Sequence, residues 1–525
     1  MFVVHNMLGF ASHLPGSLKP LMKWLFFALV LCVALGAFTW NRGSVFFGGG
    51  VYFTDGDCYA RMTRVRLLQE RPFAPIRHHD FENYPEGTRP HTTAPLDYLI
   101  AGLAAVLSPF FGNCLELAGA WISPLLGLAT LGFLFWWGRG MPFAAATVIL
   151  LAVSPIVAHG FLLGRPDHQS LLLLVIAVAL AAETRIWTGG SGGMLSAAAW
   201  GMALWVSLFE PLILLGAVLL ARLCAGRLRM ARKPLALFAG ILLAAYIFDG
   251  FRAGAFDARF SNWAKNIGEL RHGSPDLIFS WAGWLVFPAP VILLIRFFRG
   301  RGPVCFLFAV LLLVLGWLAF WHVRWGYFFV LVFASALPFV LPFFRWKWAG
   351  WGILIVSLWP VATAWEQSLY PDDGVFRERV ESVADGVALR DASLALRDLP
   401  RHGVIAPWWF SPAIVWWSGQ PCVGGTSHQS LPGIADTAEF FLSGGDGNDI
   451  LFRRDSPYVI AYEPDRVVSN SALILNRAAP ANPLARRLYQ NRGRGLIHAN
   501  RFFRVYDFSK NKTESPAGGM PPSDR

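Results

Sequence analysis

The sequence predicts a polytopic α-helical membrane protein with a mixed α/β domain on its C-terminal side. Of the 525 residues, 55% are hydrophobic and only 15% are charged, whereas about a quarter of an ordinary soluble protein is charged. Apolar segments of bilayer-spanning length recur up to residue 366, and 43 Phe with 23 Trp suit interfacial aromatic belts. This composition excludes a cytosolic enzyme, a disordered chain and a fibrous repeat.

The surplus of positive charge does not indicate a nucleic-acid partner. The formal net charge is +12, but the basic residues fall mainly in short turns between apolar segments and form no single stripe, so they indicate membrane orientation. The 6 Cys residues show no CxxC spacing. Neither a zinc site nor a disulfide framework is therefore indicated.

A bilayer crossing requires about 20 mostly apolar residues, and we expect about 11–13 transmembrane helices within 22–366. The first span is expected to be a signal anchor and not a cleaved signal sequence, because the chain continues into many further spans. The expected spans are 22–40, 115–137, 141–160, 168–185, 194–208, 209–224, 234–251, 277–297, 303–321, 325–344 and 348–366.

Positive charge sets the orientation of these spans. Lys19 and Lys23 precede the first one, so residues 1–21 are expected in the cytoplasm. The later basic turns share that side only if 94–112 does not cross, and we expect this segment to be an amphipathic helix on the outer surface. The non-cytoplasmic side then receives the chain after about residue 367 and the loops 41–93, 161–168 and 252–276.

The chain becomes charged and rich in turns from Tyr370 onward, which predicts a soluble domain over 367–510. The tail 511–525 has a composition typical of disorder. The domain alternates expected helices with β-like stretches, and therefore reads as a mixed α/β module. The helices are 375–398 and 434–443, and the strands are Val404–Ala406, Tyr458–Ala461 and Phe502–Tyr506.

Polar residues that suit chemistry occur in the external loops. Asp55 and Asp57, one residue apart, form an oxygen-rich pair suited to Mg²⁺ or Mn²⁺, although a solvated turn or a helix cap explains them equally well. Asp167 and Arg165 belong to Gly164-Arg-Pro-Asp-His-Gln169 between two spans. They either serve function or simply cap the helix and snorkel.

Two further residues complete the candidates. Glu269 in the loop 252–276 is, in isolation, most simply a surface carboxylate. Arg324 opens an outward-facing helix, where it suits either an interfacial anchor or a phosphate-binding guanidinium. Together, Asp55, Asp167 and Glu269 would hold a divalent cation, and Arg324 the other end of an anionic ligand. Such a site beside lipid suggests a substrate with an apolar tail and a phosphate head.

These motifs resemble those of the GT-C superfamily of membrane glycosyltransferases, and most closely the single-subunit oligosaccharyltransferases of bacteria and archaea. The similarity covers the order of motifs along nearly the whole chain. Three stretches in the external loops resemble family patterns in the first half of the chain: Asp55 with Tyr59 and Arg61 is similar to D-x-[WY]-Y-x-x-R, Tyr84-Pro-Glu-Gly87 is similar to Tyr-Pro-Pro-Gly, and Gly164–Gln169 is similar to G-x-x-D-H-H. Two further stretches follow later in the chain: Asn266-Ile-Gly-Glu269 is similar to Ser-Val-x-Glu, and Trp408-Trp-Phe-Ser-Pro412 is similar to W-W-D-Y-G.

Two residues depart from the family pattern. Phe410 stands where the family has the Asp that helps to recognise the Ser or Thr of an Asn-x-Ser/Thr acceptor. Gln169 stands where archaeal members have a metal-binding His. The first departure puts the usual acceptor in doubt, whereas the second weakens one ligand that His168 or water would replace.

The resemblance implies transfer of a sugar or oligosaccharide from a polyprenyl-phosphate or polyprenyl-diphosphate donor, on the periplasmic face of a bacterial inner membrane. It also implies the site. The catalytic residues would be Asp55, Asp57, Asp167 and Glu269, and the ligands of Mn²⁺ or Mg²⁺ would be Asp55, Asp167, His168 and Glu269. Arg324 and Arg165 would bind the donor phosphate. Trp408, Trp409 and His428 would bind the acceptor.

Other interpretations remain open. Because of Phe410, a GT-C transferase acting on lipid or polysaccharide is nearly as well supported as one acting on protein. A transporter or flippase of lipid-linked glycans is disfavoured, because the sequence shows no obvious internal repeat and no paired broken helices. A structural membrane protein would tolerate substitution of Asp55, Asp167 and Glu269, whereas a metal-dependent transferase would lose activity.

Overall fold

The computed structural model describes residues 18–71, 74–90, 92–228, 231–250, 257–490 and 495–509. The expected tail 511–525 and nearly all of the expected cytoplasmic segment 1–21 lie outside this set. The chain forms two compact units. The membrane unit comprises Met1–Thr54, Thr92–Gly250 and Gly268–Gly374, and the α/β unit comprises Asp55–His91, Phe251–Ile267 and Val375–Arg525.

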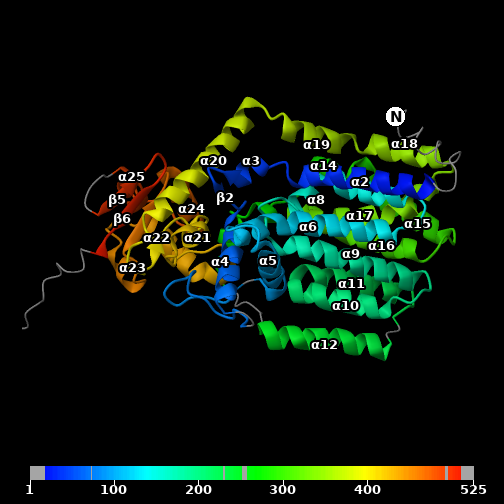
Figure 1. Ribbon diagram of the computed structural model, residues 1–525, viewed down its shortest axis with the longest axis horizontal. Helices are drawn as coiled ribbons and strands as arrows, with labels where there is room; N and C mark the ends of the chain where they lie inside the picture. Colours follow the sequence, from blue (N-terminus) through cyan, green and yellow to red (C-terminus); the bar gives the residue numbers. More distant parts are fainter. Residues whose placement is uncertain are drawn as a thin grey trace, which may run out of the picture. The chain divides into compact units, whose positions relative to one another are not determined.

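The membrane unit is a bundle of apolar helices that lie side by side (Figure 1). Its longer helices are α2 (Leu18–Phe38), α5 (Ala94–Leu107), α6 (Cys114–Trp137), α7 (Ala144–Val153), α9 (His168–Trp187), α10 (Gly193–Val206), α11 (Phe209–Cys224), α12 (Arg232–Asp249), α15 (Ala289–Phe298), α16 (Val304–Trp321), α17 (Gly326–Val340), α18 (Lys347–Ser357) and α19 (Trp359–Leu369). Within the described residues, 6 helices are long and apolar enough to cross a membrane. The protein is a multi-pass membrane protein.

Three of the spans expected as single helices are broken. The segment 141–160 is divided into α7 and α8 (Pro155–Gly160), 277–297 into α14 (Pro275–Ala282), η2 (Trp284–Val286) and α15, and 348–366 into α18 and α19. Proline is the first or second residue of α8, α14, α15 and α19, because its missing N–H and fixed φ suit a first helical turn and interrupt a preceding one. The first break is also held from outside, since Ser154 Oγ donates a hydrogen bond of 2.7 Å to the Trp281 carbonyl.

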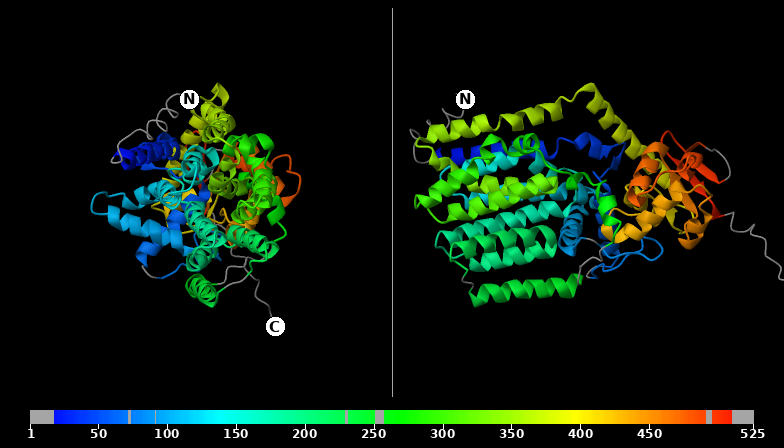
Figure 2. Two further views of the ribbon diagram at one scale, coloured as in Figure 1. Left: turned by 90° about the vertical axis from the view of Figure 1, so that its right-hand side faces the viewer. Right: turned by 180° about the vertical axis from the view of Figure 1, so that it is seen from behind.

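Several short elements join these helices in the membrane unit. After α2, the chain forms α3 (Arg42–Val45) and an antiparallel hairpin of β1 (Phe46–Phe47) and β2 (Gly50–Val51), which the sequence did not predict. Helix α5, within the segment expected on the outer surface, runs crosswise to the long helices (Figures 1 and 2). The remaining elements are η1 (Gly268–Leu270), η3 (Val323–Trp325) and η4 (Leu341–Phe343).

The α/β unit is built on a four-stranded sheet in the order β3-β4-β6-β5. Strand β3 (Val404–Ile405) is parallel to β4 (Tyr458–Ala461), whereas β6 (Arg504–Asp507) is antiparallel to both β4 and β5 (Leu496–Ala499). The three expected strands are present, and β5 was not predicted. The helices are α4 (Gly56–Glu70), α13 (Phe260–Ala264), α20 (Asp373–Leu394), α21 (Ser411–Ser418), α22 (Leu431–Leu442), α23 (Asn448–Arg453), α24 (Pro464–Leu475) and α25 (Leu484–Gln490).

The core of the α/β unit gathers side chains from distant parts of the sequence. Trp263 of α13 packs with Leu431, Ile434 and Ala438 of α22 and with Ile474 of α24. Helix α4 packs on α21. There the Arg66 guanidinium lies 3.6 Å from the centre of the Trp416 ring and donates a hydrogen bond of 3.1 Å to the Trp416 carbonyl. The unit therefore requires all three of its chain segments.

Candidate functional site

The turn between α8 and α9 places the first group of polar residues in the membrane unit. Gly164 adopts a φ of +74°, and a Cβ there would lie 2.8 Å from a Val45 methyl group and 3.2 Å from the Tyr52 carbonyl oxygen. Its N–H donates to Ala120 O at 2.9 Å, and its carbonyl accepts from Thr54 N at 3.0 Å. Glycine is required both by the backbone conformation and by this close packing.

Replacing Gly164 by alanine is expected to lower the free energy of unfolding by about 2 kcal/mol, because a side chain at positive φ is strained and this one also meets Val45. Thermal unfolding of the purified protein in detergent measures the change. Gly140→Ala is the matched control, since Gly140 has a φ of +87° but open space around its Cβ position. If both variants unfold at the same temperature, crowding does not fix the turn.

Arg165 is the centre of the polar group, and its side chain is only 4% exposed. Its Nη2 lies 2.7 Å from Glu269 Oε1 and 3.3 Å from Asp167 Oδ2. Its Nη1 donates to Gln169 Oε1 at 3.1 Å and to the Tyr327 hydroxyl at 3.3 Å. A planar guanidinium satisfies all four partners at once, which an ammonium group does not.

Asp167 occupies the N-cap position of α9 but makes no side-chain capping hydrogen bond. Its carboxylate lies instead near Arg165 and near His168, whose Nδ1 is 2.7 Å from Asp167 Oδ1. The simple helix-capping interpretation therefore does not explain this residue.

Glu269 is positioned by backbone hydrogen bonds in the segment that follows it. Val323 N donates to Arg271 O at 3.0 Å, and Gly273 N donates to Phe320 O at 3.0 Å, which ties η1 and its continuation to the end of α16 and to η3. The second oxygen of Glu269 accepts from Gln169 Nε2 at 3.3 Å. Gln169, which departs from the family pattern, thus donates a hydrogen bond that holds the Glu269 carboxylate in place.

Arg324 has a carboxylate partner that is not predictable from the sequence. It forms a hydrogen-bonded ion pair with Glu210, whose side chain is 1% exposed. Ser207 Oγ donates to the other Glu210 oxygen at 2.5 Å. Glu269 and Asp167 also act electrostatically on Arg324. We call these five residues, Arg165, Asp167, Glu210, Glu269 and Arg324, the acid–arginine cluster.

The acid–arginine cluster carries oxygen donors that suit a hard divalent cation. Asp167 Oδ2 and Glu269 Oε1 both lie within ion-pair distance of the same Arg165 nitrogen, so the guanidinium stands where two carboxylates converge. Within the described residues, no group of three or more His, Cys, Asp or Glu side chains is gathered as metal ligands. The carboxylate oxygens of Asp167 and Glu269 therefore fit a cation only if the Arg165 guanidinium leaves them for another partner.

Asp55 and Asp57 belong to the α/β unit, at the beginning of α4. Asp55 is the N-cap residue, and its Oδ1 accepts from Cys58 N at 2.9 Å. The helix-cap interpretation thus accounts for one carboxylate oxygen. The sharing of a metal by Asp55, Asp167 and Glu269 stays a prediction.

The expected acceptor residues are also in the α/β unit. Trp408 Nε1 donates to Asn470 Oδ1 at 2.8 Å, and the Trp409 ring lies 5.4 Å from the Arg466 guanidinium. Phe410 packs edge-on against Tyr462 and Phe503, at ring-centre distances of 5.0 and 5.4 Å. The position that carries an acid in the family pattern is therefore part of an aromatic cluster. His428, by contrast, is an exposed residue of η5 (His428–Ser430).

No protein-family profile matches the chain. A segment of 171 residues, 31% of this chain, is 25% identical to the dolichyl-phosphooligosaccharide-protein glycotransferase 1 of Archaeoglobus fulgidus. The match spans 28% of that protein's length.

The similarity in structure extends over more of the chain. The A. fulgidus oligosaccharyltransferase AglB, in complex with an inhibitory peptide and a dolichol-phosphate, superposes with a TM-score of 0.63 at 14% identity, over 85% of this chain and 70% of its own. ArnT from Cupriavidus metallidurans, bound to undecaprenyl phosphate, gives 0.55 at 14% identity, over 92% and 97%. The fold is that of the GT-C membrane glycosyltransferases. This GT-C fold, with its small C-terminal β-containing unit, confirms the predicted fold class.

Proposed function

We propose that the protein is a GT-C glycosyltransferase that transfers a sugar or oligosaccharide from a polyprenyl-phosphate or polyprenyl-diphosphate donor. The acid–arginine cluster carries the proposal, because it places two guanidiniums and three carboxylates together in a unit of apolar helices. Ionisable groups in such surroundings are expensive and usually serve function. AglB and ArnT, which share the fold, were solved with dolichol-phosphate and undecaprenyl phosphate.

Arg165 and Arg324 would bind the donor phosphate. Both guanidiniums already contact carboxylate oxygens, and a phosphate oxygen would take the place of a carboxylate oxygen at the same N–H donors. The leaving phosphate gains negative charge as the glycosidic bond breaks, and fixed guanidiniums stabilise that charge without reorganising. Glu210, held by Ser207, keeps Arg324 in place before the donor binds.

Asp167, His168 and Glu269 would hold a divalent Mn²⁺ or Mg²⁺ once Arg165 turns to the phosphate, and Asp55 is the further ligand that the resemblance implies. A related structure, of the A. fulgidus oligosaccharyltransferase, contains Zn and sulfate. The bound ion would supply Lewis-acid stabilisation of the phosphate. A carboxylate within hydrogen-bond reach of the acceptor would also orient it or take its proton, and Asp55 or Asp57 is proposed for this role.

The acceptor is proposed to be a lipid or polysaccharide in preference to an Asn-x-Ser/Thr peptide. An aromatic ring at position 410, packed against Tyr462 and Phe503, offers no carboxylate to a Ser or Thr hydroxyl. Trp408, Trp409 and His428 remain the proposed acceptor contacts. We place the reaction on the periplasmic face of a bacterial inner membrane, as the distribution of basic turns suggests.

The test uses the purified full chain in detergent, supplied with a native lipid extract that carries radiolabelled lipid-linked sugars, with Mn²⁺ or with a chelator. Label is expected to leave the donor lipid in the presence of metal. Asp167→Asn and Glu269→Gln are each expected to lower that rate about a hundredfold, the scale of losing one preorganised electrostatic group. Glu366→Gln, an exposed carboxylate on α19, is the matched control and should retain the full rate.

The destination of the label tests the acceptor. Counts that appear in a second lipid or in polysaccharide support the proposal, whereas counts in a synthetic Asn-x-Thr peptide contradict the proposed acceptor class. If label stays on the donor in every fraction while the donor still binds, the transfer proposal is wrong. A transporter or flippase of lipid-linked glycans then becomes the better interpretation.

A further inference from the structure

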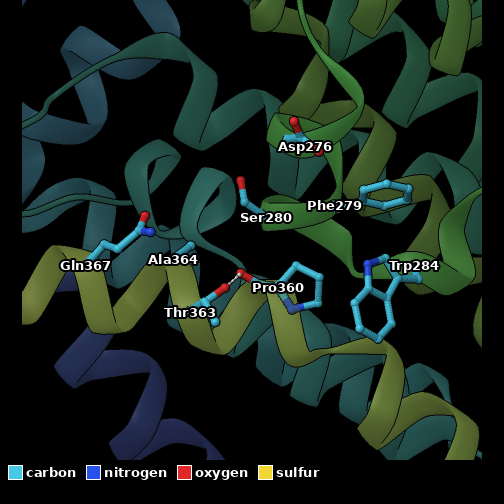
Figure 3. Close-up of a pocket in the computed structure, with 8 residues that line it drawn as sticks. All are labelled: Asp276, Phe279, Ser280, Trp284, Pro360, Thr363, Ala364 and Gln367. Carbon is cyan, nitrogen blue, oxygen red and sulfur yellow. Dashed lines mark hydrogen bonds between the residues drawn. The ribbon is translucent and has the colours of Figure 1, made fainter.

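A groove of about 280 Å³ opens in the membrane unit between α14 and α19 (Figure 3), and none of its lining residues belongs to the acid–arginine cluster. Its lining changes in character along its length. Asp276 lies near the start of α14 and Gln367 near the end of α19, while Pro360 lies near the start of α19 and Trp284 begins η2, which follows α14. In the orientation that the basic turns predict, the end with Asp276 and Gln367 faces the non-cytoplasmic membrane surface, and the end with Trp284 and Pro360 lies deeper in the bilayer.

The walls of the groove are fixed by contacts that involve the backbone. Gly283, which follows α14, has a φ of +79°, and a Cβ there would lie 2.3 Å from the Ser357 carbonyl oxygen. The next residue but one, Leu285, donates its N–H to Ser357 Oγ at 2.7 Å. On the other side of α14, Trp281 O accepts from Ser154. The groove is therefore a built feature and not a loose gap between two helices.

Most polar groups of the lining are hydrogen-bond acceptors, and its N–H donors belong to Gln367 and Trp284. Ser280 Oγ donates its hydrogen to Leu277 O at 2.7 Å, and Thr363 Oγ1 donates its hydrogen to Pro360 O at 2.9 Å. Both hydroxyl oxygens therefore retain only accepting lone pairs. Asp276 adds a carboxylate and is the one charged side chain among the lining residues, all of which are described. A complementary ligand carries positive charge and several N–H donors.

We propose that this groove binds a membrane lipid with a primary-amine headgroup, of the phosphatidylethanolamine type. The ammonium would lie against Asp276, with its three N–H donors shared between the carboxylate and the hydroxyl oxygens of Ser280 and Thr363. The acyl chain would run over Trp284, which is 43% exposed at the other end of the groove. The volume is close to the lower end of the roughly 300–1,000 Å³ of small-molecule sites, and so suits a headgroup and not a whole lipid.

The chemistry distinguishes this lipid from other abundant ones. A choline headgroup has the same charge but no N–H donors, and a glycerol headgroup leaves the phosphate charge next to Asp276. The proposal does not depend on the proposed transfer activity. A lipid at this place would be structural or regulatory, and its loss would leave the acid–arginine cluster unchanged.

The test is native mass spectrometry of the purified full chain in detergent, titrated separately with phosphatidylethanolamine, phosphatidylcholine and phosphatidylglycerol of identical acyl chains. The ethanolamine lipid is expected to bind with about tenfold higher affinity than the other two, which corresponds to about 1.4 kcal/mol. Asp276→Asn is expected to abolish this preference. Ala364→Trp, which fills the groove, is expected to remove binding of all three at this site.

Glu366→Gln is the matched control, because it removes an exposed carboxylate from α19 that does not line the groove. It should bind the ethanolamine lipid as the wild type does. Thermal unfolding verifies that each variant is folded. Equal binding of the three lipids by the wild type, or an unchanged preference in Asp276→Asn, would overturn the proposal. A preference for phosphatidylglycerol would overturn it as well.

Discussion

Replacing Arg165 by alanine is expected to lower the free energy of unfolding by about 3–5 kcal/mol, the range for removing one partner of a buried ion pair. The variant would leave Glu269, Asp167 and Gln169 without the group that holds them together. Two carboxylates, of which Asp167 is 12% and Glu269 32% exposed, would then repel each other. Denaturant unfolding of the purified protein in detergent measures the loss.

Two further variants make this result specific. Arg185→Ala removes an exposed arginine near the other end of α9 and should change stability by less than about 0.5 kcal/mol. Arg165→Lys keeps the charge but loses the planar fork, so its stability should fall between the wild type and Arg165→Ala. If Arg165→Ala unfolds like Arg185→Ala, the acid–arginine cluster does not stabilise the membrane unit.

Glu82 is expected to make the α/β unit less stable as the pH rises. Its side chain is 2% exposed, and one carboxyl oxygen accepts from Ser430 Oγ at 3.1 Å. Burial raises the pKa of Glu82 from 4.5 to about 7, against the opposing effects of Ser430 and of Arg64. A carboxyl with a raised pKa favours folding while it is protonated. That contribution is complete below pH 4.5 and is lost as the pH rises through about 7.

The size of the effect follows from the shift in pKa, and is about 3 kcal/mol between pH 4 and pH 8. Glu82→Gln, which imitates the protonated form, should remove this part of the pH dependence and raise the stability at pH 8. Glu70→Gln changes an exposed carboxyl at the end of α4 and is the control. Thermal unfolding across this pH range tests the prediction. If the unfolding temperatures of the wild type and Glu82→Gln change with pH in parallel, Glu82 does not cause this pH dependence.

Much of the fold was predictable because bilayer spans depend on length and apolarity alone. The span expected at 115–137 is α6, and the one expected at 168–185 is the first nine-tenths of α9. The breaks were not predicted, because apolar composition continues through them. At Ser154-Pro155 the deciding contact is a hydrogen bond to Trp281, which is distant in sequence. Strand β5 was missed because it is short and only half-buried.

The residue types of the candidate site were predictable from the sequence, but which acid pairs with which arginine was not. The residue types at Arg165, Asp167 and Glu269 identified an ionic site, but the sequence does not show that Glu269 meets Arg165 across 104 positions. The partner of Arg324 was missed for the same reason, since Glu210 lies 114 positions away. Glu210 next to Pro211 was visible as a carboxylate at a span boundary, which was the available signal.

The α/β unit is assembled from chain segments that are far apart in the sequence, and this has a consequence for biosynthesis. Arg66 of α4 contacts Trp416 of α21, 350 positions later in the chain. At a translation rate of about 5–20 residues per second, α4 is complete for roughly 20–70 s before its packing partner exists. During that time its apolar face is available to chaperones and proteases. A nascent chain arrested before α21 is therefore expected to be degraded quickly, even though every preceding membrane helix has already been inserted.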